Sequence, residues 1–296
     1  MGEDYVLYEK DAAKRLVRLT FNRPDKLNAM TTAQGRELKD KIEQAEQDDD
    51  VKVIIFRGAG SCFGTGMDVA ELGSHHGHTA DHRPPSQKMR LRFDKHETWG
   101  RDGLYTTIAR CDKPTIAQVH GYCYGGHLHM LLCCDMVVAA EDALFAHPGW
   151  RYLGPGAPMV TMILLMGLRR AKEWEFTGRR LTAQEAVESG LVNKVVPLGE
   201  LDDTVTKLAE VISLEPMDGL IMGKFLFEIA LDMLGAGAFH NAYAGLHAWK
   251  TNLRYEADEF SLFKAKKDSK TITEALKKRE KHFAESPLAA SEEGEN

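Results

Sequence analysis

Residues 51–68 read VKVIIFRGAGSCFGTGMD, an apolar run that passes directly into a glycine-rich turn. A continuous apolar run of this length is typical of a strand that is buried on both faces of a parallel sheet. The residues after the turn, Met67–Leu72, have a helical pattern, so the segment predicts a strand, a glycine turn and a helix in that order. The same order recurs at residues 113–134, around a second glycine turn at 121–126. Repeated units of this kind need crossover connections, and they predict an α/β fold with a mostly parallel core.

The segments on either side extend this architecture. Residues 16–21 alternate in polarity and follow a short apolar stretch at 5–8, and together the two stretches predict a β-hairpin. The other expected elements are a helix at 31–46, strands at 136–139 and 144–146, and a helix from Pro158. Beyond about Leu201 only amphipathic helical patterns remain.

The chain is longer than most single hydrophobic cores, and its 296 residues suit one large α/β unit with an appendage. We expect three parts: an α/β core at 1–200, a helical region at 201–285 and a disordered tail at 286–296. The tail is assigned to disorder because it is acidic and rich in small residues.

The charge balance excludes one broad class of function. The chain has 38 Lys and Arg against 44 Asp and Glu, a formal net charge of -6, which argues against general attraction to nucleic acid. No apolar run reaches the roughly 18 residues of a membrane span, and the acidic start MGEDYVLYEKD has no signal-peptide character. The five cysteines, two of them adjacent at Cys133–Cys134, have no C-x-x-C spacing. We therefore expect a cytoplasmic protein without nucleic-acid or membrane partners.

A polar segment at residues 74–85 contains four histidines together with glycine and proline. These histidines lack the fixed spacing on a helix or strand that a preorganised metal site needs. We predict a mobile loop here and no metal site.

Both glycine turns follow a buried strand and open a helix, so they direct backbone N–H groups and the positive end of a helix toward whatever binds there. Two such turns that converge on one carbonyl would form an oxyanion hole for an enolate or a tetrahedral intermediate. Neither turn matches a nucleotide-binding motif. The alternative is that these glycines only allow close packing of helix on strand.

A series of motifs in the same order resembles the enoyl-CoA hydratase/isomerase (crotonase) superfamily. They are FNRPDKLNAM at 21–30, FGTGMD at 63–68, KPTIAQVHG at 113–121, Gly125–Gly126, Cys134–Asp135, FAHP at 145–148, FTGR at 176–179, AVESGLVN at 186–193, FSLF at 260–263 and LKKR at 276–279. The resemblance covers nearly the whole chain.

The resemblance implies a crotonase-like spiral of ββα units with a C-terminal helical region used in trimer packing. It also implies an acyl-CoA thioester substrate, a role in fatty acid metabolism, and a homotrimer or a dimer of trimers. Coenzyme A would be part of the substrate, with no tightly bound cofactor. The implied site residues are Met67 and Gly126 for the oxyanion hole, Lys26 and Leu27 beside the adenine and pantetheine, Asp68 as an anchor at a helix start, and Lys264 near the CoA phosphates.

The sequence departs from hydratases of this superfamily at both catalytic glutamates. His129 and Gly149 occupy their places, and residues 143–172 contain no Asp or Glu. His129 is the candidate substitute, because an imidazole is a competent acid or base near neutral pH. His147 is the second candidate, since it lies beside the vacant second position. Either histidine could instead be a buried structural group, and His127 is expected to serve packing.

Three hypotheses remain open at this point. The first is an enolate-stabilising enzyme of hydratase or isomerase type with His129 as acid/base. The second is a histidine-dependent hydrolase of a C–C bond in a β-diketone or β-keto thioester. The third is a non-catalytic homologue that only binds CoA.

Overall fold

The computed structural model describes residues 4–71, 86–100, 102–147, 158–249, 255–256 and 259–284. Several predictions fall outside these residues, namely the loop at 74–85, the replacement of a glutamate by Gly149 and the tail at 286–296.

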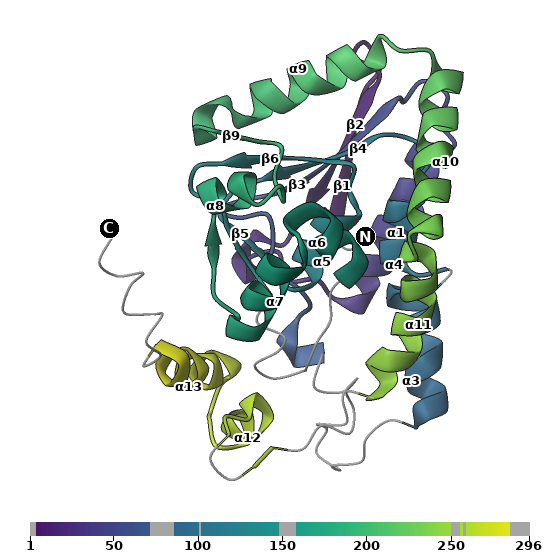
Figure 1. The fold of residues 1–296 in the computed structure, drawn as a ribbon. Helices are drawn as coiled ribbons and strands as arrows, with labels where there is room; N and C mark the ends of the chain where they lie inside the picture. Colours follow the sequence, from purple (N-terminus) through teal and green to yellow (C-terminus); the bar gives the residue numbers. More distant parts are fainter. Residues whose placement is uncertain are drawn as a thin grey trace.

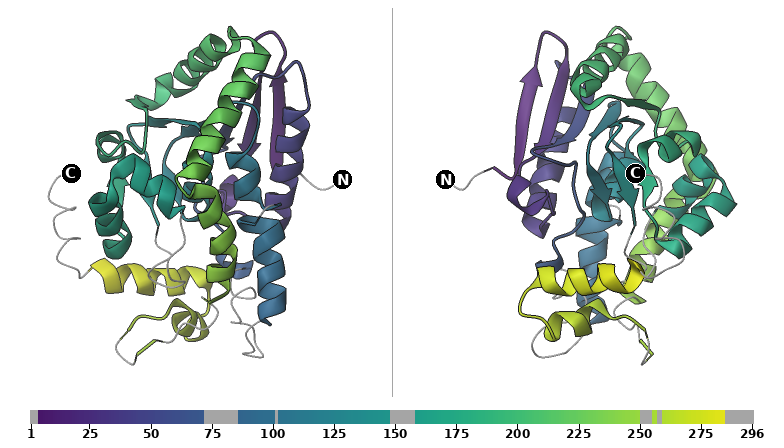
Figure 2. Two further views of the ribbon diagram at one scale, coloured as in Figure 1. Left: turned by 45° about the vertical axis from the view of Figure 1, so that its right-hand side comes forward. Right: turned by 90° about the vertical axis from the view of Figure 1, so that its left-hand side faces the viewer.

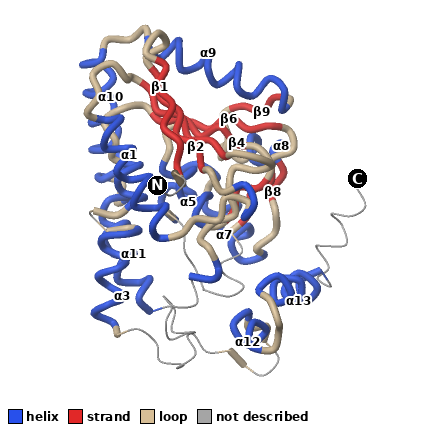
Figure 3. Tube along the Cα trace, turned by 180° about the vertical axis from the view of Figure 1, so that it is seen from behind, coloured by secondary structure: helices blue, strands red, loops and turns tan. Residues whose placement is uncertain are grey.

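The core is a six-stranded sheet with the strand order β1-β2-β3-β4-β6-β9. Its strands are β1 (Val6–Asp11), β2 (Leu16–Phe21), β3 (Val53–Gly58), β4 (Thr115–Val119), β6 (Met136–Ala140) and β9 (Lys194–Val196). The first pair is the antiparallel hairpin, and every later pair is parallel. Seen from behind, the strands gather in one twisted sheet (Figure 3). The predicted α/β class with a parallel sheet is confirmed.

A second sheet of three short strands lies beside the first. It consists of β5 (Tyr122–Tyr124), β7 (Leu144–Ala146) and β8 (Leu181–Thr182), in the order β5-β7-β8. The prediction of a simple turn at 121–126 is wrong, because β5 lies inside it and pairs in parallel with β7. Strands β8 and β9 were not predicted. They have only two and three residues, too few for a clear period of two.

The helices are α1 (Thr32–Glu46), α3 (Gln87–Phe93), α4 (Leu104–Ala109), α5 (Gly126–Cys133), α6 (Met159–Met166), α7 (Leu168–Thr177), α8 (Ala183–Glu188), α9 (Leu201–Ser213), α10 (Met217–Met233), α11 (Ala236–Trp249), α12 (Leu262–Lys267) and α13 (Ile272–Ala284), with short turns η1 (Pro24–Lys26), η2 (Asp94–Thr98) and η4 (Leu198–Glu200). Helix α9 runs along one side of the large sheet (Figure 1).

Both faces of the large sheet are covered, as the unbroken apolar run at 53–56 predicts. On β3, Val53 and Ile55 pack with α9, whereas Ile54 and Phe56 belong to the larger core cluster that includes residues of α1, α4 and α5. Successive side chains of a strand point to opposite faces, so this division follows directly from the sequence. Helix α5, which begins in the second glycine turn, is therefore fully buried under the sheet.

Among the described residues, only helices and loops follow β9. Helices α10 and α11 run along the flank of the molecule, whereas α12 and α13 lie together away from the large sheet (Figure 2). The Lys224 ammonium on α10 lies 2.7 Å from both carboxylate oxygens of Asp135, and Asp135 also accepts the N–H and hydroxyl of Thr115. This largely buried ion pair fixes α10 to the start of β4.

Candidate functional site

The two glycine turns meet through their backbones. Gly64 N–H donates to the Tyr122 carbonyl at 2.8 Å, and Tyr124 N–H donates to the Gly64 carbonyl at 2.9 Å. A Cβ on Gly66 would come within 3.0 Å of both the Gly126 nitrogen and the Tyr124 oxygen. Gly66 also has a positive φ of 92°, so it is glycine for both conformational and steric reasons. The sequence predicted two such turns, and the structure brings them together.

The N–H groups of Met67 and Gly126 lie at this meeting point. A Cβ on Gly126 would be 3.4 Å from the Met67 nitrogen, which places the two segments within the width of one small ligand. Gly126 is the first residue of α5, where N–H groups have no partner inside the helix. Neither N–H donates to any of the residues that the structure describes. Both donors are thus available to an oxygen of a ligand, and the helix dipole favours a negative one.

His127 locks the first turn to the second. Its Nδ1 accepts the N–H of Gly66 at 3.0 Å, and its ring packs edge-on against Phe21 and Phe63. Burial lowers the pKa of His127 to about 3, so the ring is neutral and keeps its lone pair for Gly66. The packing predicted for His127 is present, and the hydrogen bond adds a direct hold on the residue that precedes Met67.

The segment with Lys26 and Leu27 forms the rim of the first turn. Leu27 has a left-handed conformation with φ of 50°, and its carbonyl accepts the N–H and the hydroxyl of Thr65. The buried Asn28 amide donates to the carbonyls of Ala59 and Cys62 and so fixes the segment. Lys26 and Leu27 are both exposed, which leaves their role beside CoA a prediction.

Asp68 lies directly after Met67. One carboxylate oxygen accepts the N–H of Ala70, and the other pairs with Arg23 at 2.8 Å. Asp68 therefore ties the start of the following helix to the rim segment. Lys264, by contrast, is an exposed residue of α12, and none of its contacts with the described residues joins it to the two turns. Its proposed contact with the CoA phosphates stays a prediction.

His129 and His147 face each other. Their Nε2 atoms are 3.3 Å apart, and the Nδ1 of His147 lies 2.9 Å from Oε2 of Glu175. All three side chains are at least nine-tenths buried. Because a carboxylate only accepts, His147 donates through Nδ1, and its Nε2 then accepts from the Nε2–H of His129 when both rings are neutral. This assignment of tautomers follows from the hydrogen-bond network.

Aromatic rings surround His129. Its ring centroid is 5.3 Å from that of Trp99, 5.5 Å from that of Tyr105 and 4.9 Å from that of His147. The ring of Tyr243 on α11 packs edge-to-face with Trp99, and burial raises the pKa of the Tyr243 hydroxyl. The imidazole is therefore held in one orientation in a site of low polarity, as a group in proton transfer needs to be.

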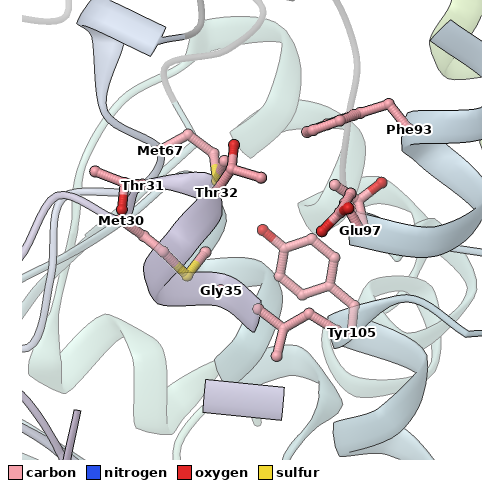
Figure 4. A pocket seen from close by; sticks show the side chains of 10 residues that line it. Met30, Thr31, Thr32, Gly35, Met67, Phe93, Glu97 and Tyr105 are labelled. Carbon is pink, nitrogen blue, oxygen red and sulfur yellow. The ribbon is translucent and has the colours of Figure 1, made fainter. Parts of the chain in front are cut away.

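A small pocket opens beside this cluster, with Met67 and Tyr105 in its wall (Figure 4). Its lining residues are Met30, Thr31, Thr32, Gly35, Met67, Phe93, Glu97, Thr98, Leu104 and Tyr105. The Tyr105 hydroxyl points into the pocket, toward the side of Met67 and Thr32. It also lies 2.9 Å from the position of a Cβ on Gly126, so the pocket adjoins the meeting point of the two turns.

Glu175 belongs to the candidate site through its contact with His147, although the sequence motifs did not single it out. It lies three residues beyond the stretch 143–172, which contains no Asp or Glu. The signal was present in the pattern of α7. Ala171, Trp174 and Glu175 are its buried residues, at the i, i+3 and i+4 spacing of one helical stripe. A charged residue on the buried stripe of an amphipathic helix indicates a specific partner inside the protein.

Two other features are absent from the described residues. Within that part of the chain, no group of three or more His, Cys, Asp or Glu side chains is placed to hold a metal ion. Likewise, none of its helices combines the length and apolar character needed to cross a bilayer.

Comparison with known proteins gives one consistent result. A family model described as enoyl-CoA hydratase/isomerase matches residues 11–285. A hydroxycinnamoyl-CoA hydratase-lyase of Pseudomonas fluorescens is 32% identical over 192 residues, which are 64% of this chain and 66% of that protein. A 4-chlorobenzoyl coenzyme A dehalogenase of Arthrobacter is 30% identical over 211 residues, 70% of this chain and 72% of that protein. A crystal structure of an enoyl-CoA hydratase from Mycobacterium smegmatis superposes with a TM-score of 0.79 at 27% identity, over 95% of this chain and 94% of that one.

Proposed function

Because this chain belongs to the enoyl-CoA hydratase/isomerase family, we propose that it binds an acyl-CoA, stabilises the enolate of its thioester, and uses His129 as acid/base. The relatives include a hydratase-lyase and a dehalogenase, so the family alone leaves the reaction open. The observation that carries the proposal is the hydrogen-bonded chain from Glu175 through His147 to His129, which ends one helical turn after Gly126.

The thioester oxygen would accept the N–H groups of Met67 and Gly126. When the α-proton leaves, its electron pair moves onto this oxygen, and two fixed donors at a helix N-terminus stabilise the resulting charge without reorganisation. His129 takes the proton. The donors belong to the backbone and are held by the Gly66–His127 hydrogen bond.

The Glu175 carboxylate determines which ring nitrogens of His147 and His129 donate and which accept. A positive charge that forms on His129 can be shared through the Nε2–Nε2 contact with His147, whose other nitrogen already bonds the carboxylate. The carboxylate thus stabilises the protonated pair, as an acidic residue does for the histidine of a hydrolase triad. Return of the proton to another carbon gives isomerisation. In hydration, the oxygen of water bonds to C3 of an enoyl thioester, the electron pair of the double bond moves through C2 onto the thioester oxygen, and C2 then takes a proton.

The test is exchange of the α-proton of a saturated acyl-CoA such as butyryl-CoA in D₂O, followed by mass spectrometry. The wild-type protein should exchange it, and His129→Gln should lower the rate by at least about 100-fold. His282→Gln, a change of an exposed histidine on α13, is the matched control. An equal exchange rate in His129→Gln would rule out the acid/base role. Binding of acyl-CoA without exchange by the wild type, together with a negative result in the hydrolysis assay described below, would instead identify a non-catalytic homologue.

The second candidate function is hydrolysis of a C–C bond in a β-keto thioester or β-diketone, and the bond from Glu175 to His147 favours it. A carboxylate-linked histidine is suited to activate water. Water would add to the C3 carbonyl, the C2–C3 bond would break toward the thioester enolate, and C2 would take a proton. Incubation of 3-oxoacyl-CoAs and cyclic diketones in H₂¹⁸O should then give a carboxylic acid with one labelled oxygen. Its absence across the panel would remove this candidate.

We further propose that the chain forms a homotrimer or a dimer of trimers in the cytoplasm, with α10 in an interface. Helix α10 exposes a row of large apolar side chains, among them Met222, Phe225, Leu226, Phe227 and Met233. A patch of this kind on a folded protein marks an interaction surface. Light scattering coupled to gel filtration should give three or six chains, and Phe227→Asp should shift the protein toward smaller species. A monomer in the wild type would contradict the proposal.

A further inference from the structure

The polar side chains that line the pocket differ in whether they have a hydrogen-bond partner among the described residues. Thr31 accepts the Gln34 N–H, Thr32 donates to Glu71, Glu97 pairs with Arg36, and Thr98 donates to the Asp94 carbonyl. Tyr105 alone among them makes no hydrogen bond with the residues that the structure describes, although its side chain is only 3% exposed. Because this hydroxyl faces the pocket, an acceptor that enters the pocket can pair with it.

The ring of Tyr105 is held rigidly. Its centroid is 4.4 Å from that of Trp99, at an interplanar angle of 31°, and its edge faces His129. Burial raises the pKa of the phenol, which therefore stays protonated and acts as a donor. Figure 4 shows the hydroxyl directed into the pocket rather than into the core. A fixed donor with no acceptor is suited to select a ligand oxygen at one place.

The position of that oxygen follows from the neighbouring donors. The Cβ position of Gly126 lies 2.9 Å from the Tyr105 hydroxyl and 3.4 Å from the Met67 nitrogen. The hydroxyl and the oxyanion N–H groups are therefore close enough for two oxygens of one short acyl segment to reach both. An oxygen on C3 is the nearest substituent to the thioester carbonyl that can accept a hydrogen bond without disturbing C2, where the proton is exchanged.

We propose that Tyr105 is a specificity-determining residue that donates a hydrogen bond to an oxygen on C3 of the acyl group, and that the preferred ligands are 3-oxo- or 3-hydroxyacyl thioesters. The proposal rests on the acyl-CoA function proposed above. An acyl chain without this oxygen removes the phenol from the pocket water and offers it no acceptor, which lowers the affinity for that acyl-CoA. The substrate of C–C hydrolysis and the product of hydration both carry an oxygen on C3, so both can accept the hydrogen bond from Tyr105.

The experiment measures dissociation constants by calorimetry for acetoacetyl-CoA, 3-hydroxybutyryl-CoA and butyryl-CoA. It uses His129→Gln protein so that no ligand is consumed, with and without Tyr105→Phe. With Tyr105 present, at least one of the two oxygenated ligands should bind about tenfold or more tightly than butyryl-CoA, because one hydrogen bond of this kind contributes roughly that factor. Tyr105→Phe should bring the ratio close to one and leave butyryl-CoA binding within about threefold.

Tyr8→Phe removes a buried, unpartnered hydroxyl on β1 and should not change the ratio. A ratio that survives Tyr105→Phe would overturn the proposal, and so would equal affinity for the three ligands with Tyr105 present. If none of the three ligands binds, the acyl-CoA function itself fails and takes this inference with it. That outcome is distinct from binding without discrimination, which refutes the role of Tyr105 alone.

Discussion

Acidification should destabilise this fold through His127, the buried residue that accepts the N–H of Gly66 in the first glycine turn. Burial lowers its folded pKa to about 3, whereas an unfolded histidine has a pKa of about 6.5. The unfolded chain therefore binds the proton first, and stability that is fully present above pH 6.5 is lost as the pH falls toward 3. The expected loss from this residue is about 1 kcal/mol at pH 6 and about 2 kcal/mol at pH 5.

These values depend little on the exact folded pKa, because any value below about 4 leaves the ring almost fully neutral at pH 5. The assay is urea unfolding of the wild type and His127→Asn at pH 7, 6 and 5, at one protein concentration. The Asn carbonyl can still accept the Gly66 N–H, and the other histidines contribute equally to both proteins. The difference between the two pH profiles therefore isolates His127.

Between pH 7 and pH 5 the free energy of unfolding of the wild type should fall by about 2 kcal/mol more than that of His127→Asn. Two parallel profiles would refute it, since they would show that the ring already carries a proton in the folded state or gains none on unfolding. In ¹³C-labelled protein, the His127 ring resonance should also stay unshifted over this range. A midpoint near pH 6 would contradict the structure directly.

Three further outcomes are expected. Glu175→Gln should lower the catalysed rate by at least about 100-fold with little change in KM, because an amide can donate to His147 and favour the wrong tautomer. Glu173→Gln, on the exposed face of the same helix, is the control in steady-state kinetics. An unchanged rate in Glu175→Gln would show that the Glu175 carboxylate is only structural. Gly64→Ala should destabilise the fold by about 1–3 kcal/mol in thermal unfolding, because its Cβ would come 2.3 Å from the His127 ring; an unchanged melting temperature would count against the close approach. Lys224→Met should lower the free energy of unfolding in urea by about 2 kcal/mol. This is less than for a fully buried ion pair, because the Asp135 side chain is 31% exposed. No loss of stability would mean that water replaces the ion pair.

The sequence was sufficient for the large elements of the fold. The second strand of the hairpin, at 16–21, alternates with the period of a strand, and the apolar run at 51–57 has the short length and the following glycines typical of a buried parallel strand. The two glycine turns each marked the entry to a helix. It was not sufficient for the small sheet, since β5 and β8 are held by pairing with β7 rather than by their own pattern. Tertiary contacts decide such short strands.

The candidate site was likewise predictable only in part. The sequence pattern located both turns because their glycines are constrained by backbone geometry at Gly66 and by contact at Gly126. The relation between His129 and His147 depends on side chains from two different elements, and the carboxylate of Glu175 comes from a third. No spacing in a linear sequence encodes that convergence. The only sign of this arrangement in the sequence is Glu175 itself, a glutamate on the buried stripe of a helix.

The hydrogen bond from Gly66 to His127 has a consequence for how such a protein can change over time. The groups that would stabilise charge are peptide N–H groups, which every substitution short of proline retains, and their placement is fixed by glycines and by a ring outside the proton path. The groups that would move protons are side chains on α5, after β7 and on α7. Selection can therefore replace the proton-transfer residues one at a time while the backbone groups that stabilise charge stay in place. An ancestral acid/base pair can then be lost without loss of the charge-stabilising part of the site.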